Sequence, residues 1–172
     1  MSHESDDDYA EYVAARLTRL HRTAYFICGD AHTADDVVQA TLLSLYRSWK
    51  RARSSEDLDG YVYRIMTRRF LDLKRSPWSR VLLRADPPDL PVTTGDAVEQ
   101  RSAIVAALQQ LPKGQRAILV LRYFSDLSVE ATAHVLGCSP GNVKSQSSRG
   151  LAALRTIMAA PQPADALHRG GN

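Results

Sequence analysis

Residues 137–155, GCSPGNVKSQSSRGLAALR, combine helical apolar spacing with an unusual number of small and polar side chains. The first half carries groups that can hydrogen-bond DNA, namely Asn142, Lys144, Ser145, Gln146, Ser148 and Arg149. In a major groove, Lys and Arg donate to guanine and Asn and Gln pair with adenine, while serine hydroxyls bond phosphates. The pattern favours a helix that presents one face to DNA, although an ordinary helical hairpin with a polar face would share it.

The residues before this segment predict a helix-turn-helix. Ser128 is expected to cap a short helix that ends near Leu136, and residues 137–139 then form a tight turn. Ser139 is the expected N-cap of the next helix, and Pro140 fits its first position, where no N–H is needed. A short helix, a turn with glycine and a longer helix form the motif whose second helix enters the major groove.

A second candidate site is GYVYRIMTRRFLDLKRSPW, residues 60–78, in which aromatic and basic residues alternate. The aromatic residues are Tyr61, Tyr63, Phe70 and Trp78, and the basic ones are Arg64, Arg68, Arg69, Lys74 and Arg75. Aromatic rings that stack on unpaired bases, beside cations that follow the phosphates, are typical of single-strand binding. The alternative is that the rings are core residues and the arginines are solvated, and for Tyr61 and Phe70 both interpretations are equally open.

The charge distribution agrees with contacts to nucleic acid. The net charge of +3 is small, but residues 1–46 hold eight acidic and three basic side chains, whereas residues 47–75 hold four acidic and nine basic ones. Residues 99–160 again hold more basic than acidic side chains, seven against three. Basic patches attract phosphate backbones, although many charged runs are simply solvated.

Helical spacing of apolar residues extends over almost the whole chain. One stripe of apolar residues precedes CGDAHT, residues 28–33. There Gly29 is a signal for the end of a helix, and Thr33 is the expected N-cap of the next helix. The polar run KRARSSEDLDG predicts a loop, and a third helix then closes at about Arg75. Residues 117–124 are short and very apolar, so they fit a strand or a buried helix, and the flanking helices favour the helix.

These patterns predict an all-α fold of two small helical domains joined by a flexible linker. Four prolines within residues 76–98 argue against a packed element there. We therefore expect a disordered N-terminus at 1–8, a first domain at 9–75, a linker at 76–98, a second domain at 99–160 and a disordered tail at 161–172.

Several classes of function lack their sequence signals. No apolar run approaches the roughly 18 residues that span a membrane, so we expect no membrane insertion. Because the N-terminus is acidic and polar, we expect no signal peptide, and we expect Cys28 and Cys138 to be reduced thiols of a cytoplasmic protein. The histidines show no metal-ligand spacing, and we find no phosphate-binding glycine loop or catalytic triad. We expect neither a cofactor nor an enzyme.

The motifs resemble a known family. LPKGQRAILVLRYFSDLSVEATAHVLGCSPGNVKSQSSRGLAALR resembles region 4 of the extracytoplasmic-function (ECF) sigma factors of the sigma-70 family. DAHTADDVVQATLLSLYRSW resembles their regions 2.1–2.2, and GYVYRIMTRRFLDLKRSPW resembles regions 2.3–2.4. The residue pattern of these motifs is most similar to that of the sigma-E group of actinobacteria. The resemblance spans roughly residues 9–160 apart from the linker.

The resemblance implies a transcription factor that binds core RNA polymerase and directs it to promoters. Region 2.2 would contact the β′ clamp helices through Asp35, Asp36, Val38, Gln39 and Leu42, and the β flap is a second expected contact. Melted −10 DNA would bind Tyr61, Arg64, Arg68, Arg69, Asp72 and Arg75. The duplex −35 element would bind the first half of the last helix, from Asn142 to Arg149. Many relatives also bind an anti-sigma factor and some do not, so that partner stays open.

Three positions depart from the pattern of many relatives. Ala40 stands where glutamate is frequent, Arg68 where asparagine is frequent, and Ser148 where some relatives carry an aromatic or longer side chain. The alternative function is a stand-alone helix-turn-helix regulator. Such proteins usually dimerise to match two half-sites, and the sequence shows no dimerisation coil.

Overall fold

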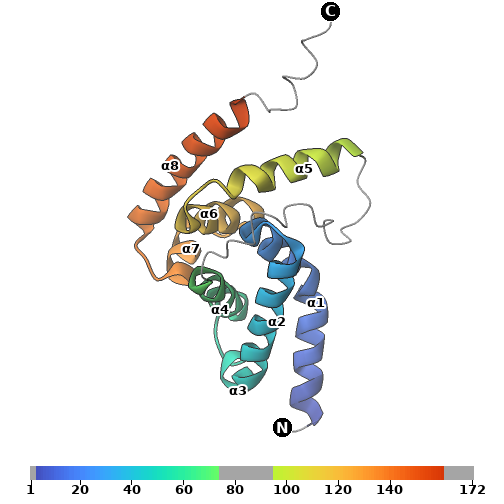
Figure 1. The fold of residues 1–172 in the computed structure, drawn as a ribbon. Helices are drawn as coiled ribbons and strands as arrows, with labels where there is room; N and C mark the ends of the chain where they lie inside the picture. The colour runs from blue at the N-terminus through green and yellow to red at the C-terminus, as the bar shows by residue number, and fades with distance from the viewer. Residues whose placement is uncertain (1–2, 74–94, 161–172) are drawn as a thin grey trace, which may run out of the picture.

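The computed structural model describes residues 3–73 and 95–160, and every regular element in those ranges is helical (Figure 1). The amino-terminal unit consists of α1 (His3–Cys28), α2 (Ala31–Arg47), α3 (Trp49–Ala52) and α4 (Leu58–Asp72). The carboxyl-terminal unit consists of α5 (Gly95–Leu108), α6 (Lys113–Leu119), the π-helical η2 (Val120–Phe124), α7 (Val129–Leu136) and α8 (Pro140–Ala159). The predicted all-α fold with two helical groups is confirmed.

The α1–α2 connection depends on two local signals. Gly29 takes a left-handed φ of 88°, which ends α1 as expected. The side chain of Asp30 then accepts a hydrogen bond from the Thr33 amide at 2.7 Å, so Asp30 is the N-cap of α2. The prediction of Thr33 as the cap is wrong, because Thr33 lies three residues inside the helix, where its amide is the donor.

Residues 3–8 were expected to be disordered, yet they form the start of α1. Long-range contacts explain the difference. The rings of Tyr9 and Tyr12 lie 5.3 and 5.6 Å from that of Trp49, and Arg53 donates to the Asp8 carboxylate at 2.8 Å. Acidic residues at a helix N-terminus also interact favourably with its dipole. A local composition rule cannot detect contacts to residues 37–45 positions away.

Residues 50–60, which were expected to be a loop, overlap the short helix α3 and the first turn of α4, and Ala52 of α3 is completely buried. Asp57 then caps α4 by accepting from the Gly60 amide at 2.8 Å. At its other end α4 stops at Asp72, slightly before the expected Arg75, because Leu73 adopts extended backbone angles. Residues 74–94 lie outside the described residues.

Residues 117–124 are helical, which confirms the buried helix over the strand. After Leu119 the helix widens into a π turn, and Val120 and Leu121 are completely buried there. The predicted linker was too long at its carboxyl end, because residues 95–98 belong to α5. Most of that linker and the predicted disordered tail at 161–172 lie outside the described residues.

The two units share one continuous hydrophobic core. It joins Leu20 and Phe26 of α1 and Phe70 of α4 to Leu108 of α5 and Leu121 of η2. In Figure 1, α6 and α7 lie between α8 and the amino-terminal unit. A smaller cluster of Ile118, Ala133 and Val143 holds α8 to α6 and α7. The two helical groups are therefore packed against each other in the structure.

Candidate nucleic-acid interface

The helix-turn-helix is built from the caps that the sequence indicates. The Ser128 hydroxyl accepts from the Ala131 amide at 3.0 Å and begins α7, and Gly137 ends α7 with a φ of 66°. The Ser139 hydroxyl accepts from the Asn142 amide at 3.1 Å, with Pro140 in the first turn of α8. These caps confirm the predicted ends of both helices and fix the direction in which α8 leaves the turn.

The small residues of α8 serve packing as well as exposure. Val143, Ser147 and Gly150 form its buried side. A Cβ atom added to Gly150 would lie 3.1 Å from a methyl group of Leu119, so the glycine permits close approach between α8 and α6. The expectation that the small residues of this helix serve a macromolecular partner does not include this packing role.

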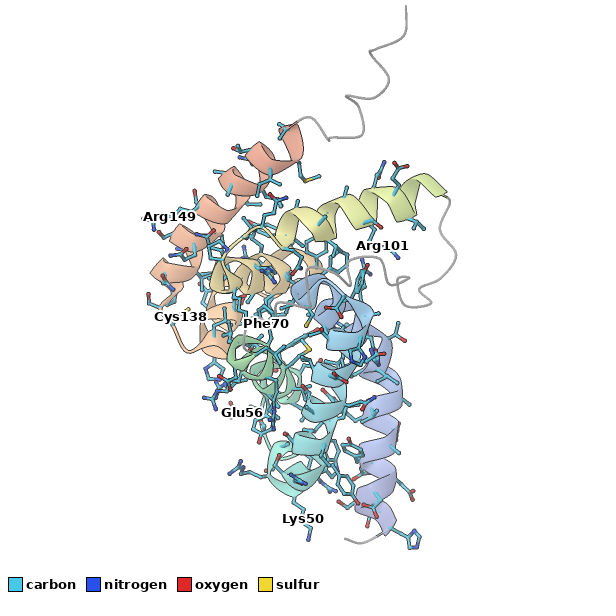
Figure 2. The ribbon with its side chains drawn as sticks, in the orientation of Figure 1. Lys50, Glu56, Phe70, Arg101, Cys138 and Arg149 are labelled. Atoms are coloured by element: carbon cyan, nitrogen blue, oxygen red, sulfur yellow. The ribbon has the colours of Figure 1, made fainter. Side chains whose placement is uncertain are left out.

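The opposite side of α8 is polar, cationic and accessible. Asn142, Lys144, Ser145, Ser148 and Arg149 are exposed, and Figure 2 shows Arg149 on the outer side of the helix. Asn142, Ser145 and Arg149 share one face because they are three and four residues apart. Gln146 is half-buried, and its amide oxygen accepts from Gln115 at 3.0 Å. Residues 140–159 contain no acidic side chain, so nothing on this helix repels phosphate.

The arginines of α4 differ in how they are held. Arg64 donates to His134 of α7 twice, to the ring Nε2 at 2.7 Å and to the backbone oxygen at 3.0 Å. Arg68 is exposed and lines a cavity of about 340 Å³ between α4 and α7. Arg69 donates to the Ser44 hydroxyl at 2.8 Å. Asp72 is exposed at the end of α4, and Arg75 lies outside the described residues.

The aromatic residues of α4 divide between core and surface. Phe70 is only 3% exposed, and its ring lies 5.2 Å from the Lys113 ammonium and 5.6 Å from the Arg116 guanidinium. Tyr63 is also buried, whereas Tyr61 is half-buried. The core alternative therefore holds for Phe70 and Tyr63. Trp78 lies outside the described residues.

The Tyr61 hydroxyl is held at the α3–α4 corner. It bonds the Ser48 hydroxyl at 3.1 Å and accepts from Arg51 at 3.3 Å. These two hydrogen bonds lower the pKa of Tyr61 below its ordinary value, the bond to Ser48 having the larger effect. Tyr61 is the one aromatic residue of α4 that is not buried.

The two acids of α2, Asp35 and Asp36, lie in its second turn, and each has a histidine partner. Asp35 lies 3.0 Å from His21 Nδ1, and Asp36 lies 3.6 Å from His32 Nε2. Further along α2, Gln39 is exposed and Leu42 is half-buried. Val38 is different, because it is 1% exposed and its side chain belongs to the core. It can support the α2 surface but cannot contact a partner while the helix stays packed.

Sequence reasoning missed two residues of the α2 surface. Leu43 and Tyr46 are 52% and 40% exposed, and they extend the face of Gln39 by one and two turns. Large apolar side chains at such exposure are common singly, but an aligned pair beside acids forms a candidate contact surface. The adjacent pair Leu42 and Leu43 is the sequence signal for this surface. Successive residues of a helix point in different directions, so only one of the two side chains can be completely buried.

Two further observations on the described residues concern metal binding and thiol reactivity. They contain no cluster of three or more His, Cys, Asp or Glu side chains with metal-binding geometry. Burial raises the pKa of the Cys28 thiol to about 12, which makes it a poor nucleophile at neutral pH. Within the same residues, no helix is long and apolar enough to cross a membrane.

Comparisons with known proteins match both halves of the chain. The family described as "Sigma-70 region 2" matches residues 12–80, and "Sigma-70, region 4" matches residues 101–154. The chain is similar to the RNA polymerase sigma-E factor of Streptomyces coelicolor, with 34% identity over 89% of this chain and 87% of that protein. Its identity to the sigma-E factor of Streptomyces avermitilis is 33%, over 90% and 87% of the two chains.

Solved structures support the same fold. The sigma factor RpoE of Bartonella quintana, in complex with the anti-sigma factor NepR, matches with a TM-score of 0.72 and 21% identity over 90% of this chain and 99% of that one. CnrH in complex with the cytosolic domain of CnrY matches with a TM-score of 0.67 and 21% identity, over 91% of each chain. From its helix-turn-helix, its two matched regions and these relatives, the chain belongs to the ECF sigma factors of the sigma-70 family.

Proposed function

We propose that this sigma factor assigns its three tasks to three helices: α8 binds the duplex −35 element, α4 binds the melted −10 strand, and α2 binds core RNA polymerase. The observation that carries the proposal is the pairing of two different nucleic-acid surfaces in one chain. One is the acid-free, exposed face of α8, and the other is the row of arginines beside Tyr61 on α4.

The α8 surface suits duplex DNA. Asn142, Ser145 and Arg149 lie on one exposed face near the start of the helix, which is the part that enters the major groove in this motif. Arg149 can donate two hydrogen bonds to a guanine, and Asn142 can pair with an adenine. Lys144 and Ser148 flank this face, where phosphate contacts would fix the position of the helix. Gln146 is held by Gln115, so it would contact DNA only after that bond is broken.

The α4 surface suits unpaired DNA. Tyr61 offers a partly exposed ring, and Arg64, Arg68 and Arg69 supply positive charge along the helix. Extruding a base costs a few kcal/mol, and stacking it on a protein ring returns about 1–3 kcal/mol. One such ring therefore does not open a promoter unaided, and we expect weak promoter binding until polymerase contributes its own contacts.

The α2 surface suits a basic protein partner with an apolar groove. Asp35 and Asp36 carry negative charge in the second turn of the helix, and Leu43 and Tyr46 follow as exposed apolar groups. Complementary charge speeds and orients association, and central apolar residues supply most of the affinity. In this proposal the chain supplies specificity from the cytoplasm, while the polymerase supplies catalysis.

Binding to core polymerase tests the proposal directly. Core RNA polymerase is titrated into the dye-labelled chain, and the fluorescence anisotropy gives the Kd. The double substitution Asp35→Lys and Asp36→Lys should raise the Kd at least tenfold. The control Glu130→Lys reverses the charge of an exposed acid on α7 and should leave the Kd within twofold. If the unaltered chain does not bind core polymerase, the proposed function is wrong.

A further inference from the structure

The cavity of about 340 Å³ between α4 and α7 combines cationic and apolar walls. Its polar side chains include Arg64, Arg68 and His134, and its apolar ones include Leu71 and Leu136. Of the described residues, no aspartate or glutamate lines it. Binding sites for small molecules have volumes of about 300–1,000 Å³, so this cavity is large enough for one small molecule. The absence of acids from its walls favours a molecule with negative charge.

The two arginines of the cavity lack a counter-charge within the described part of the chain. Arg64 and Arg68 are four residues apart, so they lie on the same face of α4. The ion pairs among the described residues engage other arginines, Arg16 and Arg53, and neither of these two. Like charges at this spacing repel each other and destabilise a helix. An anion bound between the two guanidinium groups would remove that repulsion.

Hydrogen bonds hold one wall of the cavity in a fixed arrangement. Nη2 of Arg64 donates to Nε2 of His134 at 2.7 Å and to its backbone oxygen at 3.0 Å. Because an arginine can only donate, His134 Nε2 accepts here, and the proton of the neutral ring lies on Nδ1. The second bond also covers a carbonyl at the carboxyl end of α7, whose partial negative charge would otherwise repel an anion. Nε and Nη1 of Arg64 remain as donors for a ligand.

We propose that this cavity binds a small phosphate monoester of about the size of a nucleoside monophosphate. A phosphate monoester carries a charge of about −1.5 to −2 at pH 7, which matches two guanidinium groups beside a neutral histidine. Guanidinium groups bind phosphate oxygens through paired hydrogen bonds and also stack on aromatic rings. The organic group of the ester would lie against Leu71 and Leu136.

A molecule in this cavity would compete with DNA for α4. Arg64 and Arg68 are two of the three arginines of α4 that the proposed function assigns to the melted −10 strand, and the phosphate would engage both. The free chain would therefore bind single-stranded DNA more weakly when the ester is present. This competition rests on the proposed function, whereas the cavity site itself does not.

Isothermal titration calorimetry of the full chain with adenosine 5′-monophosphate (AMP) tests the site. We expect one molecule to bind per chain, with a Kd below about 1 mM. Adenosine lacks the phosphate and inorganic phosphate lacks the organic group, so each should bind at least about tenfold more weakly than AMP. No detectable binding of AMP, or equal affinity for AMP and either fragment, would overturn the site.

A substitution on α4 tests the role of the paired charges. Arg68→Met removes one charge at an exposed position and should raise the Kd for AMP about fivefold or more. Arg22→Met removes the same charge from an exposed position on α1, outside the cavity, and should leave the Kd within about twofold. Equal effects of the two substitutions would indicate general charge attraction and would overturn the site.

Alkylation of Cys138 locates the bound molecule. Cys138 lines the cavity, and Figure 2 shows it at the turn between α7 and α8, whereas Cys28 ends α1 and does not line the cavity. Saturating AMP should slow the reaction of Cys138 with iodoacetamide severalfold and leave that of Cys28 unchanged, as measured by mass spectrometry of the modified peptides. Binding of AMP without protection of Cys138 would place the molecule elsewhere and overturn this cavity as its site.

Fluorescence anisotropy of a labelled single-stranded DNA oligonucleotide tests the competition. At constant ionic strength, saturating AMP should raise the Kd of the oligonucleotide severalfold, and adenosine should leave it unchanged. An unchanged Kd in the presence of bound AMP would overturn the competition. If the oligonucleotide does not bind even without AMP, the proposed function of α4 fails, while the calorimetric result for the cavity stands.

Discussion

Arg116 and Ile27 are 89 positions apart, yet the guanidinium of the one donates to the backbone oxygen of the other at 3.0 Å. The contact couples the end of α1 to α6 of the carboxyl-terminal unit. Arg116 is buried and also donates hydrogen bonds to Gln109 and Leu111. It therefore stabilises the α5–α6 turn as well as the contact between the two units. A single side chain therefore links the fold of one unit to its position against the other.

Arg116→Met should destabilise the whole chain. The substitution keeps an unbranched side chain that can fill the space of the arginine stem, but it leaves the oxygens of Ile27 and Gln109 without this donor. An unsatisfied buried polar group costs about 1–3 kcal/mol, so we expect the free energy of unfolding to fall by about 2 kcal/mol or more. Urea denaturation followed by circular dichroism measures it. Arg149→Met, at an exposed position, should change stability by less than about 0.5 kcal/mol, and equal effects of the two would contradict this role.

Asp59 predicts a dependence of stability on pH. Burial raises the pKa of this carboxyl, but hydrogen bonds from Arg16 and Tyr12 outweigh it, so the pKa lies below its ordinary value. The ionised form stabilises the fold, and this contribution is complete above about pH 4 and is lost as the pH falls further. Because Asp59 and Arg16 are partly exposed, we expect a contribution of only about 0.5–1 kcal/mol.

The variant Asp59→Asn isolates that contribution. It should be less stable than the unaltered chain at pH 7, and the difference should shrink toward pH 2.5, as measured by urea denaturation at both values. Asp72→Asn removes the exposed carboxylate of the last residue of α4 and should show no such pH-dependent difference. If the free energy of unfolding of Asp59→Asn differs from that of the unaltered chain by the same amount at both pH values, the ionised carboxylate is not the cause of the difference.

Leu43→Ser should weaken polymerase binding without affecting the fold. The side chain is 52% exposed, so its loss costs little stability, whereas burial against a partner would make it a strong contact. We expect the Kd for core polymerase to rise about tenfold. Val98→Ser alters another exposed apolar residue, on α5, and serves as the control. An unchanged Kd for Leu43→Ser would remove Leu43 from the polymerase surface.

Arg149→Ala should reduce −35-dependent transcription. A bidentate contact to a base discriminates by about 1–3 kcal/mol, which corresponds to a roughly 5- to 150-fold loss of activity. Arg155→Ala removes a cation from the same helix, further from its start, and should reduce this transcription less than threefold. Transcripts from one promoter, with its −35 element intact or scrambled, measure both. If scrambling the −35 element reduces transcription equally with the Arg149→Ala variant and with the unaltered chain, Arg149 does not contact that element.

The features that sequence predicted are those set by neighbouring residues. Ser128, Gly137 and Ser139 act as caps because their side chains or backbone angles satisfy groups within three or four positions. The helical state of residues 117–124 was also predicted from its flanking helices. The N-cap at Asp30 was missed because Asp and Thr both cap helices, and only the geometry shows which side chain accepts.

The features that sequence missed depend on distant contacts. Residues 3–8 are helical because the start of α1 packs near Trp49 and Arg53. The position of Val38 in the core, and of Leu43 outside it, depends on how α2 rotates against α1 and α4. The contacts that Arg116 and His134 make between the two units cannot be predicted from the nearby sequence. Neighbouring residues do not reveal whether an arginine is buried against a distant segment or exposed to solvent.

Transcription in vitro tests the central claim most directly. Purified core RNA polymerase from an actinobacterium is combined with the chain and genomic DNA, and the 5′ ends of the RNA are sequenced. The account predicts discrete start sites that share two spaced upstream motifs and that disappear when the chain is omitted. Start sites identical to those of core polymerase alone would contradict the assignment of this chain as a promoter-specificity factor.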